Sequence, residues 1–185
     1  GDIQVDGAGV DDERLRAWQS ALGYVPQDIF LTDASVSENI AFGVEGLEID
    51  AAQVERCARM AQLHDFVVNE MPEGYDTIVG ERGVRLSGGQ RQRIGIARAL
   101  YHDPEVLVFD EATSALDTVT ERAVMESIDA LHHQKTIILI AHRLSTVERC
   151  DDIVLLDHGR ITAQGTYEAL KASDERFRRM AAADR

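Results

Sequence analysis

Residues 106–111 read Val-Leu-Val-Phe-Asp-Glu, four apolar side chains followed directly by two carboxylates. A continuous apolar run of this length indicates a strand buried on both faces, because a half-exposed strand would alternate apolar and polar residues. In open α/β sheets, ligands bind outside the carboxyl ends of such strands. We therefore expect Asp110 and Glu111 to belong to a functional site. The alternative is that they only cap the helix that follows.

A glycine turn precedes this strand. Residues 86–90 read Leu-Ser-Gly-Gly-Gln, and the apolar spacing over residues 90–101 predicts a helix directly after the turn. A Ser-Gly-Gly turn that opens a helix presents backbone N–H groups and a hydroxyl to an anion. Only glycine lets the backbone approach a phosphate closely. The turn is therefore a candidate anion-binding site, made by Ser87, Gly88, Gly89 and Gln90.

The charge around this turn is opposite to that of the whole chain. The formal net charge is -14, which argues against nonspecific binding of nucleic acid. Residues 82–98 nevertheless hold five arginines and no acidic residue. These arginines could be a solvated helix face, or they could form a site that tolerates phosphate charge. They are Arg82, Arg85, Arg91, Arg93 and Arg98.

The order of the remaining elements predicts an α/β fold. Apolar runs at residues 137–140 and 153–156 predict two more strands, and helical patterns at 120–131 and 145–150 separate the three apolar strands. Alternating strands and helices with continuous apolar strands indicate a covered, mainly parallel sheet. Other expected elements are a strand at 1–6, a helix at 11–22 with Leu15, Trp18 and Leu22 inward, a strand that begins at Gly23 and ends at Pro26, a helix opened by a capping box at Ser35–Glu38, a helix at 50–69, an edge strand at Ile161 and a helical tail at 166–180.

Length and cysteine usage indicate one domain from a reducing compartment. The 185 residues are too few for two ordinary domains. Cys57 and Cys150 lack a C-x-x-C partner, so we expect two reduced, buried thiols. We find no signal peptide and no apolar stretch near the ~20 residues that a membrane helix needs.

Together, the glycine turn and the acidic strand resemble the ATP-binding cassette of ABC transporters, and the resemblance covers essentially the whole chain. It implies an α/β fold of the P-loop NTPase (RecA-like) class, with a mainly parallel sheet and a helical subdomain. It also implies a helical subdomain at about residues 45–102, a core at about 103–165 and a helical tail at 166–185. Gly80-Glu81-Arg82-Gly83, and Ile29-Phe30-Leu31 with Ser37-Glu38-Asn39-Ile40, resemble the exporter type.

The resemblance assigns roles to the residues at the strand ends. Asp110 would orient Mg²⁺, and Glu111 would polarise the water that attacks ATP, because phosphoryl transfer depends on charge neutralisation and alignment. His142, after the strand at 137–140, resembles the switch histidine that contacts the γ-phosphate. Gln27 resembles the glutamine that reaches Mg²⁺ or water and couples the site to the transport domain; on its own it would be an ordinary loop glutamine.

The resemblance also implies partners. The glycine turn would close on ATP held by a second cassette, and Ser114-Ala115-Leu116-Asp117 resembles the loop that crosses the dimer interface. Asp117 could instead be only a helix cap. The cofactors would be ATP and Mg²⁺. A transmembrane domain on the same polypeptide would anchor the ATPase at the cytoplasmic face of a membrane, the bacterial inner membrane, and no nucleic acid would be bound.

The chain has no phosphate-binding loop of the pattern G-x-x-x-x-G-K-[ST]. Its two lysines, Lys135 and Lys171, follow no glycine loop. We therefore expect this chain to be the part of a cassette that follows the P-loop, incomplete at the N-terminus and inactive alone. Two alternatives stay open: a non-transport ABC ATPase that acts on DNA or ribosomes, and a regulatory fragment that docks on an intact cassette without hydrolysing ATP.

Overall fold

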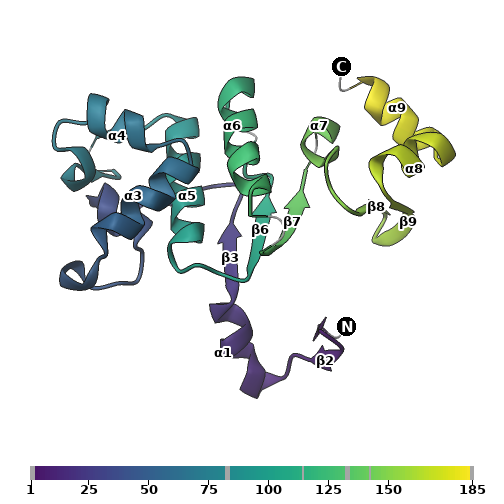
Figure 1. Cartoon of the computed structure of the whole chain (residues 1–185), viewed down its shortest axis with the longest axis horizontal. Helices are drawn as coiled ribbons and strands as arrows, with labels where there is room; N and C mark the ends of the chain where they lie inside the picture. Colours follow the sequence, from purple (N-terminus) through teal and green to yellow (C-terminus); the bar gives the residue numbers. More distant parts are fainter. Residues whose placement is uncertain (1–2, 82–83, 114, 132–133, 142, 184–185) are drawn as a thin grey trace. The chain divides into compact units, whose positions relative to one another are not determined.

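The structure is a computed structural model, and it describes residues 3–81, 84–113, 115–131, 134–141 and 143–183. The chain divides into two compact units, residues 1–138 and residues 139–185. Figure 1 shows the order of the elements along the chain. Each unit is described by itself below.

The first unit is built on a sheet with the strand order β3-β6-β7. β3 (Leu22–Val25) pairs in parallel with β6 (Val106–Asp110), and Tyr24 lies opposite Val108. β7 (Thr136–Ile140) is the other neighbour of β6, and the three arrows point the same way in Figure 1. The predicted α/β fold with a parallel sheet is confirmed.

Helix α5 (Gly88–Tyr101) is the centre of the packing in this unit. Its buried face includes Ile94, Ile96 and Leu100. β3 passes so close to this helix that a Cβ at Gly23 would lie 2.6 Å from the carbonyl oxygen of Ala99, so only glycine permits the approach. The other helices of the unit are α1 (Asp12–Ser20), α2 (Val36–Ile40), α3 (Ala51–Met60), α4 (His64–Glu70) and α6 (Thr118–Asp129), with short 3-10 turns η1 (Gly46–Glu48) and η2 (Gly74–Asp76).

Short strands complete the first unit. β1 (Gln4–Val5) and β2 (Ala8–Gly9) form a hairpin whose turn residues, Asp6 and Gly7, both have positive φ. β4 (Ala34–Ser35) pairs antiparallel with β5 (Ile78–Val79). β4 leads into α2, and the predicted capping box at its start is present.

Two helix predictions in this unit are wrong in detail. The single helix expected over 50–69 is two helices, because Gln62 adopts a left-handed backbone with φ 54° between α3 and α4. The inward face expected for residues 11–22 is also wrong, since α1 has no buried residue and Leu15 is 40% exposed. Apolar spacing predicts which face of a helix can pack, but not whether another element covers that face.

The second unit has its own small core, made by Leu144, Ile153, Leu170 and Phe177. β8 (Ile153–Asp157) and β9 (Arg160–Gly165) form an antiparallel hairpin that turns at His158 and Gly159, both at positive φ. The helices are α7 (Leu144–Val147), α8 (Tyr167–Ser173) and α9 (Glu175–Ala183).

Three predictions for this unit need correction. Within the described residues, the apolar run at 153–156 pairs only with the edge strand β9, in a separate two-stranded antiparallel sheet, and not with β7. The tail expected as one helix is two, because Asp174 ends α8 and its carboxylate accepts a hydrogen bond from the backbone N–H of Phe177 at 2.7 Å. Of the two thiols expected to be buried, Cys57 is buried and Cys150 is only half-buried.

Candidate functional site

The acidic pair lies at the carboxyl end of β6, in the middle of the three-stranded sheet. Asp110 is the last residue of the strand, and Glu111 has a left-handed backbone with φ 50°. This conformation is unfavourable for any residue other than glycine by about 1 kcal/mol or more, and such strain clusters at functional sites. Neither carboxylate caps the next helix, because α6 is capped by Asp117. The helix-cap interpretation of the pair is therefore wrong.

The structure brings Gln27 to this pair. The Gln27 Nε2 group donates a hydrogen bond to Glu111 Oε2 at 3.0 Å. Gln27 follows β3 by two residues, and the parallel pairing of β3 with β6 places both strand ends at the same edge of the sheet. Gln27, Asp110 and Glu111, three residues predicted as site members, thus lie together.

Tyr24 is a member of this cluster that the sequence did not reveal. Its hydroxyl donates to Asp110 Oδ2 at 3.0 Å, and this bond is the main reason that the pKa of Tyr24 is raised above its ordinary value of 10.0. A tyrosine hydroxyl is protonated at neutral pH in any case, so it acts as the donor in this bond. In the pairing, Tyr24 lies opposite Val108, two residues before Asp110, so alternation along paired strands puts both side chains on one face. The proximity of Tyr24 to Asp110 can therefore be recognised only when the pairing of β3 with β6 is known.

The glycine turn opens α5 with a second capping box. Ser87 Oγ accepts from the backbone N–H of Gln90 at 3.2 Å, and Gln90 Oε1 accepts from the Ser87 N–H at 2.8 Å. As the first residues of the helix, Gly88 and Gly89 have N–H groups without an acceptor within the helix. Two backbone donors and a helix N-terminus are thereby available to an anion.

The start of α5 packs against the segment that follows the acidic pair. A Cβ at Gly89 would lie 3.2 Å from the carbonyl oxygen of Ala115, and a Cβ at Gly88 would lie 3.5 Å from the Ala115 side chain. Leu116 is buried, and the Asp117 carboxylate accepts from the N–H groups of Val119 and Thr120. Asp117 is thus a helix cap, the alternative that its sequence position left open.

The arginines after the turn take part in the helix packing. Arg91 donates to the Leu86 carbonyl at 2.7 Å, and Arg93 donates to the Gln62 carbonyl at 2.6 Å. Arg98 donates to the backbone carbonyls of residues 30 and 39. Burial lowers the pKa of Arg93 and of Arg98. Each of these three arginines thus uses at least one donor on a carbonyl oxygen of the chain, and the phosphate-site interpretation of the arginines stays a prediction.

Some predicted site members lie outside the described residues. These are His142, the candidate contact to the γ-phosphate, and Ser114, the first residue of the loop at 114–117. Arg82 and Gly83, from the exporter-like Gly80–Gly83 stretch, lie outside as well.

The donor set at the sheet edge suits Mg²⁺ bound together with a phosphate. Among the described residues, no group of three or more His, Cys, Asp or Glu side chains could hold a metal ion alone. Mg²⁺ is usually held by one or two carboxylates and by substrate phosphates and water, not by an all-protein cage. The Asp110 carboxylate and the Gln27 amide oxygen are hard oxygen donors of this kind.

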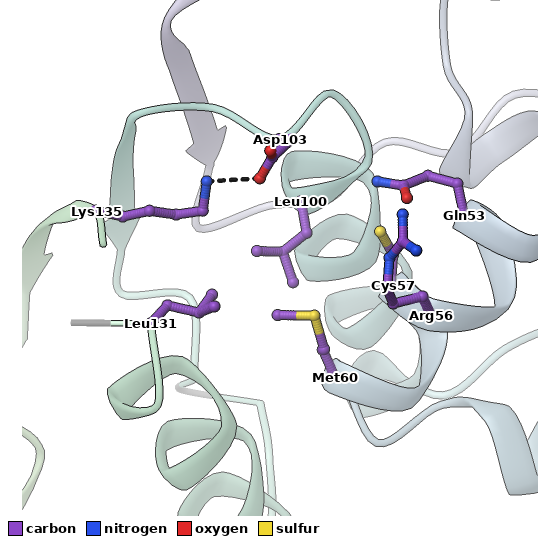
Figure 2. Close-up of a pocket in the computed structure, with 8 residues that line it drawn as sticks. All are labelled: Gln53, Arg56, Cys57, Met60, Leu100, Asp103, Leu131 and Lys135. Carbon is purple, nitrogen blue, oxygen red and sulfur yellow. Dashed lines mark hydrogen bonds and ion pairs between the residues drawn. The ribbon is translucent and has the colours of Figure 1, made fainter. Parts of the chain in front are cut away.

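A pocket with a volume of about 400 Å³ lies away from this cluster, between α3, the end of α5 and the segment around Leu131. Figure 2 shows Met60, Leu100 and Leu131 around it, with Lys135 at its edge paired to Asp103. Lys135 Nζ lies 2.6 Å from Asp103 Oδ1 and donates to the Pro104 carbonyl. These bonds hold Lys135 in the packing, in agreement with its exclusion as a phosphate-loop lysine.

In the part of the chain that the structure describes, no helix is long and apolar enough to cross a membrane.

Comparisons with known proteins agree with this geometry. A family model described as "ABC transporter" matches residues 1–114. The chain is 49% identical over 170 residues to the heterocyst differentiation ATP-binding protein HepA of Nostoc sp., covering 92% of this chain and 28% of that protein. It is 47% identical over 175 residues to the ATP-dependent lipid A-core flippase of Cupriavidus pinatubonensis, covering 94% of this chain and 30% of the flippase.

A solved structure is similar over nearly the whole chain. A bacterial Atm1-family ABC exporter with ATP bound superposes with a TM-score of 0.89 at 43% identity, covering 99% of this chain and 32% of the exporter chain. The chain thus spans about 30% of the length of these relatives. With a glycine turn that opens a helix, an acidic pair at the end of a central strand and a family match over residues 1–114, the chain belongs to the ABC transporter family.

Proposed function

We propose that this chain supplies part of the ATP-hydrolysing domain of an ABC exporter, which powers the movement of a substrate across a membrane. The observation that carries the proposal is the contact of Gln27 with Glu111 beside Asp110, at the carboxyl end of a parallel sheet. Relatives named as flippases and an Atm1-family exporter support the exporter type.

The residues of the cluster divide the work of phosphoryl transfer. Mg²⁺, when bound, neutralises charge on the phosphate oxygens, and Asp110 and Gln27 are the residues that would hold it. Glu111 orients and polarises the attacking water through its carboxylate. Tyr24 fixes the rotamer of Asp110 through its hydroxyl. His142 is proposed to contact the γ-phosphate.

The glycine turn is proposed to act on the ATP of a second cassette. The N–H groups of Gly88 and Gly89 and the hydroxyl of Ser87 would meet phosphate oxygens, and Gln90 would hold Ser87 through the capping box. Ser114, Ala115, Leu116 and Asp117 would form the interface loop, and two residues of this loop, Ala115 and Leu116, lie beside the turn. Changes at the interface would then reach the turn directly, since Ala115 lies against Gly89.

A transmembrane domain on the same polypeptide is the proposed second partner, with the ATPase on the cytoplasmic face of the bacterial inner membrane. Phe30 and Phe42 are 74% and 51% exposed, and both lie beside Arg98. Exposed aromatic side chains of this kind are typical of interfaces. Phe30 is three residues from Gln27, so a contact there would couple the transport domain to the site.

The test is Mg²⁺-dependent ATP turnover by the full-length protein in lipid vesicles. Asp110→Asn should reduce turnover by about a hundredfold or more, because the loss of one charged catalytic group has that effect. Asp76→Asn, an exposed aspartate of η2, should change nothing. Full turnover by Asp110→Asn would contradict the assignment. If DNA or ribosomes stimulate ATP turnover and lipid vesicles do not, the non-transport ATPase would be favoured.

The 185-residue chain alone is proposed to be inactive. In P-loop enzymes, the loop amides and the lysine hold the β- and γ-phosphates. This sequence has no such loop, and its charge of -14 disfavours a polyphosphate without a dedicated cradle. Calorimetric titration of the isolated chain with Mg-ATP should show no micromolar binding. Micromolar binding with turnover would refute this.

A further inference from the structure

The segment after Gln27 packs closely against helix α5, with the Ile29 side chain over Gly95. A Cβ at Gly95 would lie 2.3 Å from Ile29 Cδ1 and 2.8 Å from Ile29 Cγ1, so the Ile29 side chain occupies the space that any other residue would fill. Glycine inside a helix is less favourable than alanine. The close approach of Ile29 accounts for a glycine at this position.

Arg98, on the next turn of α5, fastens the same segment by hydrogen bonds. Its Nε donates to the Asn39 carbonyl at 2.8 Å, its Nη2 to Asn39 Oδ1 at 3.1 Å, and its Nη1 to the Phe30 carbonyl at 3.0 Å. Its guanidinium carbon also lies 4.9 Å from the ring centroid of Phe42. One side chain of α5 therefore holds three points of the segment between Phe30 and Phe42.

Asn39 extends this attachment through the segment. It is fully buried, and its amide donates to the carbonyls of Thr32, Ala34 and Ser35. Its Oδ1 accepts from the Thr32 N–H at 3.0 Å. Asn39 thus ties residues 32–39 together by hydrogen bonds, and the segment from Ile29 to Phe42 is joined to α5 at Gly95 and Arg98; we call this attachment the α5 clamp.

We propose that Arg98 is a positioning residue, which through the α5 clamp holds Gln27 at a fixed separation from the Ser87–Gly89 turn. Gln27 lies two residues before Ile29 and contacts Glu111, while Ser87 begins the helix that carries Gly95 and Arg98. A helix transmits displacement as a rigid rod, and residues 87 to 98 span roughly 16 Å. The consequence for hydrolysis rests on the function proposed above; the attachment itself does not.

The proposal predicts a specific kinetic pattern. Loss of Arg98 should lower kcat for ATP about tenfold, because displacement of a positioned group by about 1 Å can cost up to a hundredfold in rate. KM for ATP should stay within about twofold, since Arg98 contacts none of the proposed ATP-binding residues. A purely structural role would instead lower the amount of folded protein and leave kcat per folded site unchanged.

The experiment compares Arg98→Gln and Arg98→Lys with Arg59→Gln in the full-length protein. Arg59 lies on α3, and its side chain forms an exposed ion pair with Glu55, so its loss is the matched control. Lysine keeps the charge but cannot reach three acceptors with a planar fork, so both Arg98 variants should behave alike. ATP turnover is measured per folded site, together with hydrogen exchange of the amides of residues 32–40.

A glycine pair tests the other half of the clamp. Gly95→Ala favours the helix but collides with Ile29, whereas Gly46→Ala, in η1, meets nothing within 4 Å. Lowered kcat in Gly95→Ala alone, with a folded protein, would support the clamp by a route that does not remove Arg98.

The outcomes separate the two proposals. At least tenfold faster exchange at residues 32–40 with a lowered kcat and an unchanged KM supports the positioning role. Turnover within twofold of wild type in Arg98→Gln, or a loss equal to the loss of folded protein, overturns it. A wild-type protein without ATP turnover would refute the proposed function, and the exchange comparison would still decide whether the clamp exists.

Discussion

Polar side chains have opposite roles in two regions of the molecule, the packing around α5 and the carboxyl edge of the sheet. Asn39 is fully buried, and its hydrogen bonds are made inside the chain. At the sheet edge, Gln27 is exposed and Asp110 and Glu111 are half-buried, and they bond to one another and to Tyr24. Buried polar groups are costly to unpair, whereas solvated pairs exchange partners readily. The first region is therefore suited to hold shape, and the second to accept a ligand.

The largest expected effect on stability is in the helical region. Leu63→Ala, at a fully buried position, should lower the free energy of unfolding by about 3 kcal/mol through lost burial and a cavity. Leu47→Ala, the same change at a fully exposed position, should stay within about 0.5 kcal/mol. Denaturant unfolding of both variants measures the difference. Equal effects would mean that Leu63 is not part of a packed core.

At the sheet edge the largest effect should be on rate and not on stability. Glu111→Gln keeps the shape of the side chain but loses the charge that aligns water, so ATP turnover of the full-length protein should fall by about a hundredfold or more. Its unfolding temperature should not fall. Glu105→Gln, an exposed change at the other end of β6, is the control. Normal turnover by Glu111→Gln would remove Glu111 from the catalytic role.

The local elements of this fold could be predicted from the sequence alone, but its long-range contacts could not. The strand before Asp110, the capping box at Ser35 and the helix after Ser87 were predicted correctly, because each depends on signals within a few residues. The contacts of Tyr24 with Asp110 and of Arg98 with Asn39 join residues 86 and 59 positions apart, and no local pattern reports such pairing.

The solvent exposure of the strand side chains also could not be predicted from local sequence patterns. The runs at 106–109 and 137–140 look alike in sequence, but Leu107 is fully buried while Ile138 is 47% exposed. An apolar run predicts a strand; whether that strand is covered depends on the layers that pack against it. The assignment of His142 rests on the resemblance alone.

Two matched serine caps can sharpen the comparison. Ser35 and Ser87 both close capping boxes, one in the helical packing and one at the proposed ATP contact. Either serine replaced by alanine should lose about 1 kcal/mol of stability, since each loses an N-cap bond. Ser87→Ala should also lower ATP turnover, and by more than Ser35→Ala does. ATP turnover of both variants is measured per folded protein. Equal losses of turnover would mean that Ser87 acts only as a cap.

The smallest expected effect is a pH dependence at the Ser35 cap. The backbone N–H of Ser35 donates to Glu38 Oε2 at 2.8 Å, and this bond, with the Ser35 hydroxyl, holds the pKa of Glu38 below its ordinary value of 4.5. A carboxylate with a lowered folded-state pKa stabilises the fold above 4.5, and this contribution disappears as the pH falls through the folded-state pKa.

Glu38→Gln keeps a side chain that can accept the Ser35 bond but does not titrate. Wild type should therefore exceed Glu38→Gln in stability at pH 7 by no more than about 0.5 kcal/mol, because a carboxylate in the first turn of an exposed helix end contributes little more. The difference should shrink as the pH falls below 4.5 and vanish once Glu38 is protonated in the folded state, measured by denaturant unfolding in matched buffers. A difference that persists at low pH would mean that the shape of Glu38, and not its charge, supports the cap. Within the described part of the chain, the Arg98–Asn39 attachment beside it is made with amide and carbonyl oxygens and not with a carboxylate, and it should be insensitive to the same change in pH.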